Sequence, residues 1–504
     1  MQNPKQRLLK NIFSNWAGTG VTAIIAFIMS PFLVHTLGKD AYGVWTLIFS
    51  IVAYSNFFDA GMKQSLAKYI PKYYGTKNFV GLNQIINSAL LIYMITGILI
   101  IIFTLVVSFF FVDLIKCPPE LLYSMQIALI LIGLNQAISF FFMPVAALGP
   151  FHRYDILNTI EICKSIIIAL LFYFFLINSH GIVTMAIIIF TGSIFTLSTK
   201  RFIQQRLVPQ IEISKKHIDR SKIKTLLNYG SISFFIVISW LVIFNTDNIV
   251  IGMYISTSAV TVYTIAGTII NYLRTIISSI GVPLVPTVSH LESNSQYSQI
   301  NDIYKKLTKY LFYLTSCICI GIFFFIDDFI NLWMGPGFEQ TIEIVYILII
   351  PASIYLPQVI ANSILLGINK HKLLLKILVC EAVSNVILSL ILVQKWGIYG
   401  VALGTAIPQF IIYSFVYPYF FNKTISGSIK LFYSQLLKMS FYGILFTLPV
   451  SWLLLKFNYH FSWIGFIVNV GITLIFIVLG FYMVILDKNE KIKVISKIRD
   501  FIKV

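Results

Sequence analysis

Long apolar runs recur along almost the whole of this 504-residue sequence. A helix needs about 20 apolar residues to cross the hydrocarbon core of a bilayer, and the runs reach that length repeatedly. Hydrophobic residues make up 58% of the chain and charged residues only 11%, a composition that excludes a soluble globular protein. Strand-length alternation does not recur, which argues against a β-barrel. The sequence therefore predicts an all-α membrane protein with many crossings.

The apolar runs predict about 14 membrane-spanning helices, and an even number places both chain ends on one side of the membrane. The approximate ranges are 11–36, 42–64, 80–112, 120–147, 156–178, 181–199, 224–254, 258–286, 307–326, 340–366, 373–393, 397–420, 434–455 and 463–486. The first range follows three basic residues and a polar opening without a small-residue cleavage site. We expect it to be a retained helix and not a cleavable signal.

The net charge of +18 is unevenly placed along the chain. Lys and Arg gather in alternate loops, including the cluster in 200–224, and are sparse in the intervening loops. This is the positive-inside pattern, in which basic loops stay cytoplasmic. It predicts a multi-pass membrane protein with both termini cytoplasmic. Topology and contact with membrane lipids account for the charge, so we expect no nucleic-acid partner.

The same order of motifs occurs in two halves of the sequence, which indicates an internal repeat. Leu148-Gly149 and Gly181 bracket one helix, and Leu366-Gly367 and Gly397 bracket another. Tandem halves with the same number of crossings keep the same orientation, so their symmetry axis lies along the membrane normal. The predicted parts are an N-terminal lobe of six helices (1–220), a C-terminal lobe of six helices (221–424), two further helices (425–486) and a cytoplasmic tail (487–504).

The tail reads as an amphipathic basic helix. Ile495, Ile498 and Ile502 share one helical face, and lysines occupy the remaining positions. Such a segment is typical of a helix that lies on the inner leaflet, although a solvated tail is also open.

Two ionised residues lie deep in predicted spans. Arg274 is in mid-helix beside Asn271 and Tyr272, and Asp247 belongs to a polar patch with Asn245. A charge at the centre of a membrane helix costs about 2.5–3.5 kcal/mol on insertion scales, so it is rarely kept without a partner or a function. A guanidinium matches phosphate oxygens in a bidentate manner, which makes Arg274 the best anion-binding candidate. A structural ion pair with Asp247, or snorkelling, is the alternative.

Further charges are spaced for local pairs. Asp59 and Lys63 are i, i+4, which favours an ion pair or a lobe-closing contact over substrate binding. Glu161 and Lys164 are i, i+3 and can satisfy each other. Glu381 occupies the position of the second half that matches Glu161, and it has no evident local partner. It is therefore the stronger candidate of these two acids.

No catalytic or metal-binding motif stands out. The five cysteines form no ligand framework, and HExxH, Walker A and GxSxG patterns are missing from the sequence. We expect no metal, no cofactor and no enzymatic activity, and coupling to protons or sodium is left open.

Several motifs, taken in order, resemble bacterial polysaccharide flippases of the Wzx or polysaccharide-transporter type. This group belongs to the superfamily that also contains MurJ and the MATE exporters. The motifs are Leu37-Gly38 followed by Tyr42-Gly43-Val44-Trp45, Phe58-Asp59-Ala60-Gly61 with Lys63, Asp247-Asn248-Ile249-Val250-Ile251-Gly252 followed by Tyr263, and Trp396-Gly397-Ile398-Tyr399-Gly400-Val401-Ala402.

The resemblance implies two six-helix bundles in a V around a central cavity, plus two C-terminal helices. It also implies alternation between inward-open and outward-open states. The implied cargo is an undecaprenyl-pyrophosphate-linked oligosaccharide, moved for the synthesis of O-antigen, capsule or exopolysaccharide. A polysaccharide polymerase and chain-length machinery would then be partners.

Three rival functions remain. A MATE-type cation-coupled multidrug exporter shares the implied fold, but a basic residue such as Arg274 favours anionic cargo. A membrane polysaccharide polymerase or ligase usually needs a sizeable outer loop, which the predicted spans do not leave. A scaffold without transport fits poorly with charges inside membrane helices.

Overall fold

The computed structural model describes residues 4–59, 61–151, 153–178, 180–425, 427–456, 462–492 and 496, and the side chains of all of these except 4–17 and 229–233. Every regular element within these residues is helical. The chain divides into two compact units, unit 1 (Met1–Thr261) and unit 2 (Val262–Val504). Each unit is described by itself.

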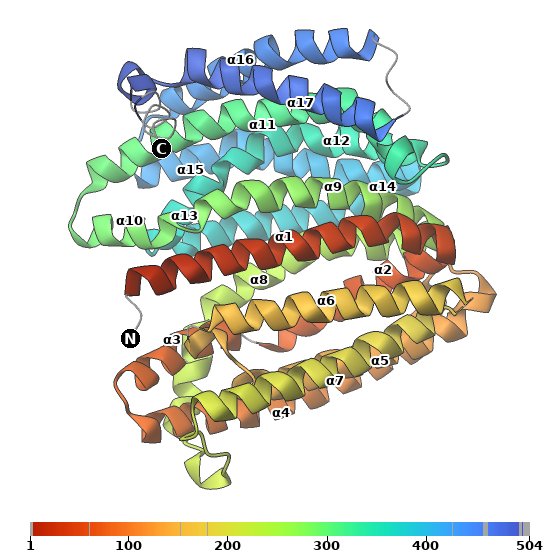
Figure 1. Ribbon diagram of the computed structural model, residues 1–504, viewed down its shortest axis with the longest axis vertical. Helices are drawn as coiled ribbons and strands as arrows, with labels where there is room; N and C mark the ends of the chain where they lie inside the picture. Colours follow the sequence, from red (N-terminus) through yellow and green to blue (C-terminus); the bar gives the residue numbers. More distant parts are fainter. Residues whose placement is uncertain are drawn as a thin grey trace. The chain divides into compact units, whose positions relative to one another are not determined.

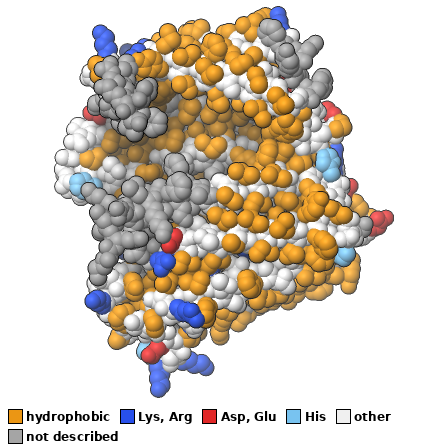
Figure 2. Space-filling view, viewed as in Figure 1, with side chains coloured by type: hydrophobic (Ala, Val, Ile, Leu, Met, Phe, Trp, Pro, Cys, Tyr) orange, Lys and Arg blue, Asp and Glu red, His pale blue; other side chains and the backbone are white. Residues whose placement is uncertain are grey.

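The membrane-spanning helices match the prediction. Among the described residues, 13 segments are long and apolar enough to cross a membrane. One of them, 371–424, reverses at Gly397, where the backbone leaves the helical region (φ 55°, ψ −131°). Counting its two arms separately gives 14 crossings, so the all-α fold with about 14 helices is confirmed. Apolar side chains are spread over much of the described surface seen in Figure 2, which suits contact with lipid.

Unit 1 contains nine α-helices among its described residues, the last of which continues into unit 2 (Figure 1). They are α1 (Pro4–Leu37), α2 (Lys39–Ala53), α3 (Met62–Gly75), α4 (Phe79–Phe110), α5 (Pro119–Phe142), α6 (Tyr154–Ile177), α7 (Ile182–Leu207), α8 (Arg220–Tyr254) and the start of α9 (Thr257–Gly281). Short 3₁₀ segments are η1 (Tyr54–Asp59), η2 (Val112–Leu114), η3 (Met143–Val145), η4 (Gly149–Phe151) and η5 (Lys215–His217).

The predicted helix 42–64 is interrupted. α2 ends at Ala53, η1 follows, and α3 begins only at Met62. Gly61 has φ +74°, a left-handed conformation that ends a helix and that glycine adopts without a Cβ clash. The break leaves Asp59 at the end of η1. Its side chain is buried and contacts Tyr93 of α4.

Side chains of α4 hold the segment that joins α7 to α8. Asn83 donates to the carbonyl of Gln210 (3.0 Å) and accepts from the N–H of Glu212 (3.1 Å). Asn87, one turn later, donates to the carbonyl of Glu212 (2.8 Å) and accepts from the N–H of Ser214 (2.9 Å). Each side-chain amide therefore both donates to and accepts from the backbone of the linker, as the backbone of a neighbouring β-strand would. We call Asn83 and Asn87 the asparagine clamp.

The same linker ends in a capped helix. Asp219 exchanges hydrogen bonds with the hydroxyl of Ser88, and its carboxylate accepts from the hydroxyl (2.6 Å) and N–H (2.7 Å) of Ser221. The hydrogen bonds from Ser221 hold the pKa of Asp219 below its usual value. α8 begins at this cap and belongs to compact unit 1. The lobe boundaries predicted from the sequence stay a prediction.

Unit 2 holds the remaining helices. They are the greater part of α9 and then α10 (Leu284–Ser293), α11 (Tyr297–Trp333), α12 (Glu339–Tyr355), α13 (Val359–Gly367), α14 (His371–Ile411), α15 (Tyr417–Thr424), α16 (Ile429–Lys456) and α17 (Trp463–Gly480). The irregular turns are η6 (Leu356–Gln358, 3₁₀), η7 (Ile412–Val416, π-helical) and η8 (Phe481–Ile485, π-helical). Within α14, a Cβ at Gly400 would lie 2.1 Å from the carbonyl oxygen of Leu392, so the two arms around Gly397 pack backbone to backbone.

Ion pairs fasten the segment after η8 to α11. Glu490 pairs with Lys306 and accepts from the hydroxyl of Tyr310 (2.5 Å), while Lys309 donates to Asp487 (3.2 Å). Partial burial acts to raise the pKa of Glu490, but the hydrogen bonds from Lys306, Tyr310 and the backbone of Asp487 outweigh it and lower the pKa to about 2. The Ile residues of the predicted amphipathic tail helix (495, 498 and 502) lie outside the described residues.

We predict that Asn87→Ala loosens the linker. The substitution leaves the carbonyl of Glu212 and the N–H of Ser214 without these partners, which costs about 1–3 kcal/mol of local stability. Amide hydrogen exchange of residues 210–214 should accelerate by about tenfold or more. Asn178→Ala is the control, because the hydrogen bond that the Asn178 amide donates within the described residues goes to the carbonyl of Phe174 in its own helix. Unchanged exchange in 210–214 would contradict the clamp.

We predict that acid releases the segment after η8. The folded pKa of Glu490 is depressed below its ordinary value of 4.5, so the stabilisation is complete above about pH 4.5 and is lost as the pH falls towards 2. Hydrogen exchange of residues 481–492, corrected for intrinsic pH dependence, should lose about threefold protection, and Glu490→Gln should abolish this dependence. Asp302→Asn, which removes an exposed i, i+3 pair with Lys305, should leave it intact.

Candidate functional site

Unit 2 encloses an acidic side chain. Glu381 of α14 is 1% exposed, and its Oε2 accepts a hydrogen bond from the hydroxyl of Tyr413 in η7 (2.9 Å). The side chain of Gln409 donates a further hydrogen bond. An isolated carboxylate in a low-dielectric interior is strongly destabilising, so these donors are what make its burial tolerable.

Arg274 of α9 belongs to the same cluster. Its guanidinium lies within electrostatic range of Glu381, Tyr355 and Tyr413, and Nη2 donates to Oδ1 of Asn271 at 2.6 Å. Two of the residues that the sequence singles out, Arg274 and Glu381, are therefore neighbours although 107 positions separate them. We call Arg274, Glu381, Gln409, Tyr355 and Tyr413 the unit 2 cluster.

Irregular backbone surrounds the unit 2 cluster. Tyr413 lies in the π-helical turn η7, and Tyr355 is the last residue of α12, before a 3₁₀ turn that contains Pro357. The two tyrosine rings are 5.7 Å apart, and Gln358 donates to the carbonyl of Tyr413 (2.5 Å). π-bulges occur frequently at functional sites because they shift the direction of side chains that a regular helix would present elsewhere.

Tyr272 and Asn271 flank Arg274 on α9. Tyr272 is partly buried and Asn271 is exposed. The hydrogen bond from Arg274 to Asn271 spans three positions of one helix, so it fixes the guanidinium against its own helix. Their roles in binding cargo stay predictions.

Asp247 lies in unit 1, on α8, and is 4% exposed. It lies within electrostatic range of Tyr54, whose hydroxyl is 2.5 Å from Oγ1 of the neighbouring Thr246. The amide of Asn245 donates to the backbone of its own helix (3.1 Å). The ion pair predicted between Asp247 and Arg274 joins two separately described units, and it stays a prediction.

Asp59 and Lys63 interact less directly than their spacing predicts. The carboxylate of Asp59 accepts from the hydroxyl of Tyr93 (2.8 Å) and from the backbone N–H of Lys63 (3.4 Å). The ammonium of Lys63 donates instead to Asn56 (3.5 Å) and lies over the ring of Phe140, 4.9 Å from its centroid. Asp59 therefore caps α3 and anchors it to α4, with Lys63 as a longer-range charge.

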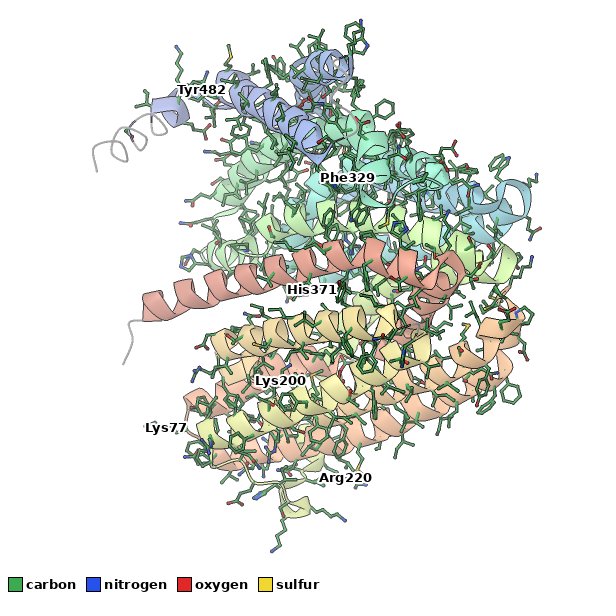
Figure 3. The ribbon with its side chains drawn as sticks, turned by 45° about the vertical axis from the view of Figure 1, so that its right-hand side comes forward. Lys77, Lys200, Arg220, Phe329, His371 and Tyr482 are labelled. Carbon is green, nitrogen blue, oxygen red and sulfur yellow. The ribbon has the colours of Figure 1, made fainter. Side chains whose placement is uncertain are left out.

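Glu161 on α6 finds its ion-pair partner on another helix. The spacing predicts a pair with Lys164, but Glu161 pairs with Lys200 of α7, and Lys164 interacts with both charges at longer range. The physical reason is that α6 packs on α7, which brings the Lys200 ammonium directly to the carboxylate. In Figure 3, Lys77 and Arg220 lie at the periphery of unit 1 and Lys200 lies among its helices.

A cavity of about 400 Å³ adjoins these three charges. It is formed by α5, the η3–η4 segment, α6 and α7. The lining residues are Ser139, Met143, Ala146, Ala147, Leu148, Gly149, Pro150, Leu157, Glu161, Lys164, Ser193, Thr196, Leu197 and Lys200. We call it the lysine cavity.

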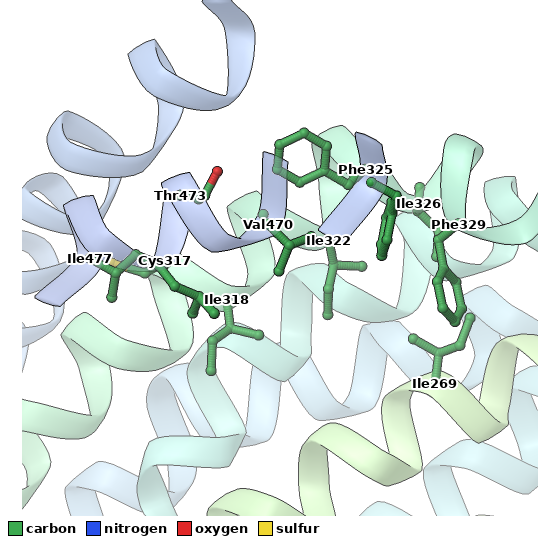
Figure 4. A pocket seen from close by; sticks show the side chains of 13 residues that line it. Ile269, Cys317, Ile318, Ile322, Phe325, Ile326, Phe329, Val470, Thr473 and Ile477 are labelled. Carbon is green, nitrogen blue, oxygen red and sulfur yellow. The ribbon is translucent and has the colours of Figure 1, made fainter. Parts of the chain in front are cut away.

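A second cavity, in unit 2, is almost wholly apolar (Figure 4). It has a volume of about 280 Å³ and lies between α11 and α17, with one residue, Ile269, contributed by α9. Phe325, Phe329 and Phe466 are among its walls, and Thr473 is its one hydroxyl. We call it the apolar groove. It can accept a hydrocarbon chain but offers no charge to bind a polar group.

The described residues contain no group of three or more His, Cys, Asp and Glu side chains arranged to hold a metal ion. The expected lack of a metal or cofactor stays a prediction.

Several partners of the predicted charges are not evident from the sequence. Gln409 and Tyr413 are i, i+4 in one apolar stretch, so the sequence indicates that they share a helical face. It does not indicate that this face contacts Glu381. The contacts of Tyr93 with Asp59 and of Lys200 with Glu161 join different helices, so no spacing within one helix indicates them.

Family models and known proteins match large parts of this chain. A family model described as "Polysaccharide biosynthesis protein" matches residues 8–292, and one described as MatE matches residues 233–391. An uncharacterised membrane protein of Methanocaldococcus jannaschii is 22% identical over 83% of this chain and 85% of its own length. A putative O-antigen transporter of Shigella flexneri is 22% identical over 79% of this chain and 94% of its own length. These matches confirm the resemblance that the sequence motifs indicated.

Two solved structures have a similar fold. An inward-facing multidrug-resistance MATE transporter of the MOP superfamily is 15% identical with a TM-score of 0.66, covering 80% of this chain and 94% of that one. The lipid II flippase MurJ, in an inward closed conformation, is 15% identical with a TM-score of 0.62, covering 90% and 98%. Identities this low establish the fold alone.

We predict that Tyr413→Phe destabilises the protein through Glu381. The substitution removes one donor from a buried carboxylate, which costs about 1–3 kcal/mol. The measurement is the free energy of unfolding in detergent, with Tyr419→Phe, an exposed tyrosine of α15, as the control. In a Glu381→Gln background the effect of Tyr413→Phe should shrink, since the charge is gone. An equal effect in both backgrounds would show that Tyr413→Phe does not act through the charge of Glu381.

Proposed function

The chain belongs to the polysaccharide biosynthesis protein family, and from this membership we propose that it moves lipid-linked oligosaccharides across a membrane. The proposed cargo is an oligosaccharide repeat unit on undecaprenyl pyrophosphate, used for O-antigen, capsule or exopolysaccharide. Three observations support the proposal: the family match, the O-antigen transporter among its relatives, and the fold shared with a lipid II flippase.

In this proposal Arg274 binds the pyrophosphate of the cargo. Pyrophosphate is the most highly charged part of the cargo and must cross about 30 Å of hydrocarbon. A guanidinium stays charged in an apolar setting and binds phosphate oxygens in a bidentate manner. Asn271 holds the Arg274 side chain against α9, and Glu381 lies within electrostatic range, which balances its charge when no cargo is bound.

In this proposal the apolar groove serves the lipid part of the cargo. A polyisoprenoid tail needs an apolar surface throughout transport, and the groove offers side chains of α11 and α17 without a charge. The groove and Arg274 belong to the same compact unit, and Ile269 of the groove precedes Arg274 by five positions on α9. One helix therefore contributes to both the apolar and the cationic surface.

We further propose that transport uses alternating access, by rocking of the two lobes. The proposed location is the cytoplasmic membrane of a bacterium with both termini cytoplasmic, which the distribution of Lys and Arg supports. Glu381 and Asp247 would respond to protons or cations. A polysaccharide polymerase and chain-length machinery would act on the product, and the chain itself would carry out no chemical conversion.

A MATE-type cation exporter is the second candidate. The MatE family model matches residues 233–391, which include the unit 2 cluster except for Gln409 and Tyr413, and a MATE transporter shares the fold. Organic cations favour carboxylates without a neighbouring cation. In this chain Arg274 lies near Glu381, which favours an anionic cargo.

We predict that Arg274→Ala slows leaflet exchange of a fluorescent undecaprenyl-pyrophosphate oligosaccharide in vesicles. Hydrogen bonds to a charged group contribute about 1.5–3 kcal/mol, so the rate should fall about tenfold or more. Arg274→Lys keeps the charge but not the bidentate geometry and should be intermediate. Arg206→Ala is the matched control, because Arg206 lies over the ring of Phe202 at the end of α7, in unit 1.

Exchange that Arg274→Ala leaves unchanged would remove Arg274 from the mechanism. Wild-type protein that moves an organic cation dye but no glycolipid would favour the exporter function. The control variant must keep the wild-type rate for either result to be informative.

A further inference from the structure

The lysine cavity is not used by the proposed transport path. All its lining residues belong to unit 1, whereas Arg274 and the apolar groove belong to unit 2. It has a volume of about 400 Å³, which is within the usual range of small-molecule sites. Its charged side chains come from two helices, α6 and α7, and hydroxyls of Ser139, Ser193 and Thr196 complete its polar lining.

The charges around the lysine cavity do not balance. Glu161 is the one carboxylate among the lining residues, and it pairs with Lys200. Within the described residues, the ammonium of Lys164 makes no hydrogen bond or ion pair, although it lies within electrostatic range of both other charges. An ammonium inside a membrane helix without a direct partner is unfavourable. One positive charge is therefore left for an anion to neutralise.

The surface next to Lys164 changes from charged to apolar along one face of α6. Glu161, Lys164, Ile167 and Leu171 are spaced by three and four positions, so they share one face of α6. Ile167 is 51% exposed and Leu171 is 36% exposed. The face therefore changes from charged to exposed and apolar within three helical turns, which is the order of groups in a lipid with an ionised head and a hydrocarbon chain.

The depth of Lys164 agrees with this order. Lys164 lies ten positions after the first residue of α6, a helix of 24 residues, so it is in the half of the helix nearest η4. At 1.5 Å per residue it lies about 15 Å from that end of the helix. The lysine side chain spans only part of this depth, so a phosphate has to enter the cavity from that end to reach it, and the apolar positions lie farther along the helix.

We propose that the lysine cavity binds the phosphate of a membrane lipid, with Lys164 as its principal ligand and with the lipid chain along Ile167 and Leu171. Lys200 contributes a second positive charge, and Glu161 limits affinity because it occupies Lys200. The shared chemistry is a phosphate ester on an apolar chain, which either an anionic glycerophospholipid or a polyprenyl phosphate supplies. The proposal does not rest on glycan transport.

The test measures lipid retention by native mass spectrometry of the full-length protein in detergent. The probes are dioleoylphosphatidylglycerol and undecaprenyl phosphate, with dioleoylglycerol as a chain-matched lipid without phosphate and inorganic phosphate as a competitor. Lys164→Gln should weaken binding of both phosphate lipids about tenfold. Glu161→Gln should strengthen it, because Lys200 is released. Lys68→Gln, an exposed lysine of α3, should have no effect.

Opposite effects of Lys164→Gln and Glu161→Gln cannot arise from general loss of folding, so that pair of results supports the site. A preference between the two phosphate lipids then identifies the source. Binding that Lys164→Gln leaves unchanged, equal retention of dioleoylglycerol, or full displacement by millimolar inorganic phosphate would each overturn the proposal.

Discussion

Buried charge in a hydrocarbon surrounding is the constraint from which the rest of this structure follows. A helix satisfies its own backbone, so apolar helices are stable in lipid by themselves, but an ionised side chain needs a donor or counter-charge. Glu381 has Tyr413, Gln409 and Arg274, and Asp59 has Tyr93. Gln409 and Tyr413 lie on or just after the second arm of α14, whereas Arg274 and Tyr93 lie on other helices. Tertiary packing, and not local spacing, decides which charges can be kept.

Breaks in the helices provide that packing. η1 and Gly61 interrupt the second membrane span where Asp59 must turn towards α4, and the π-turn η7 carries Tyr413 to Glu381. A regular helix fixes the direction of every side chain at 100° steps, so a polar group that must reach a distant partner benefits from a 3₁₀ or π turn. The interruptions free backbone groups, and side chains such as Gln358 then satisfy them.

Hydropathy was sufficient to predict the spans, because lipid exposure requires long apolar runs whatever the packing. It was also sufficient to identify Arg274, Glu381 and Asp247 as unusual. The partners could not be predicted, since nothing local links Tyr413 to Glu381. Glu161 shows why local rules fail: an i, i+3 lysine was available, yet Lys200 of α7 lies nearer. The asparagine clamp was missed because Asn83 and Asn87 bind backbone, which sequence patterns do not display.

The two acids that the predicted sequence repeat places at matched positions have different surroundings. Glu161 and Glu381 correspond in the sequence repeat, yet the side chain of Glu161 is 39% exposed and Glu381 is 1% exposed. Glu161 lies between two lysines beside an open cavity, whereas Glu381 is enclosed by tyrosines and faces one arginine. A partly exposed acid with excess cations suits exchange of an anionic lipid with the bilayer. An enclosed acid beside a single arginine suits a site whose charge changes only when cargo or a cation enters. The surrounding side chains, and not the position along the predicted repeat, therefore decide the environment of each acid.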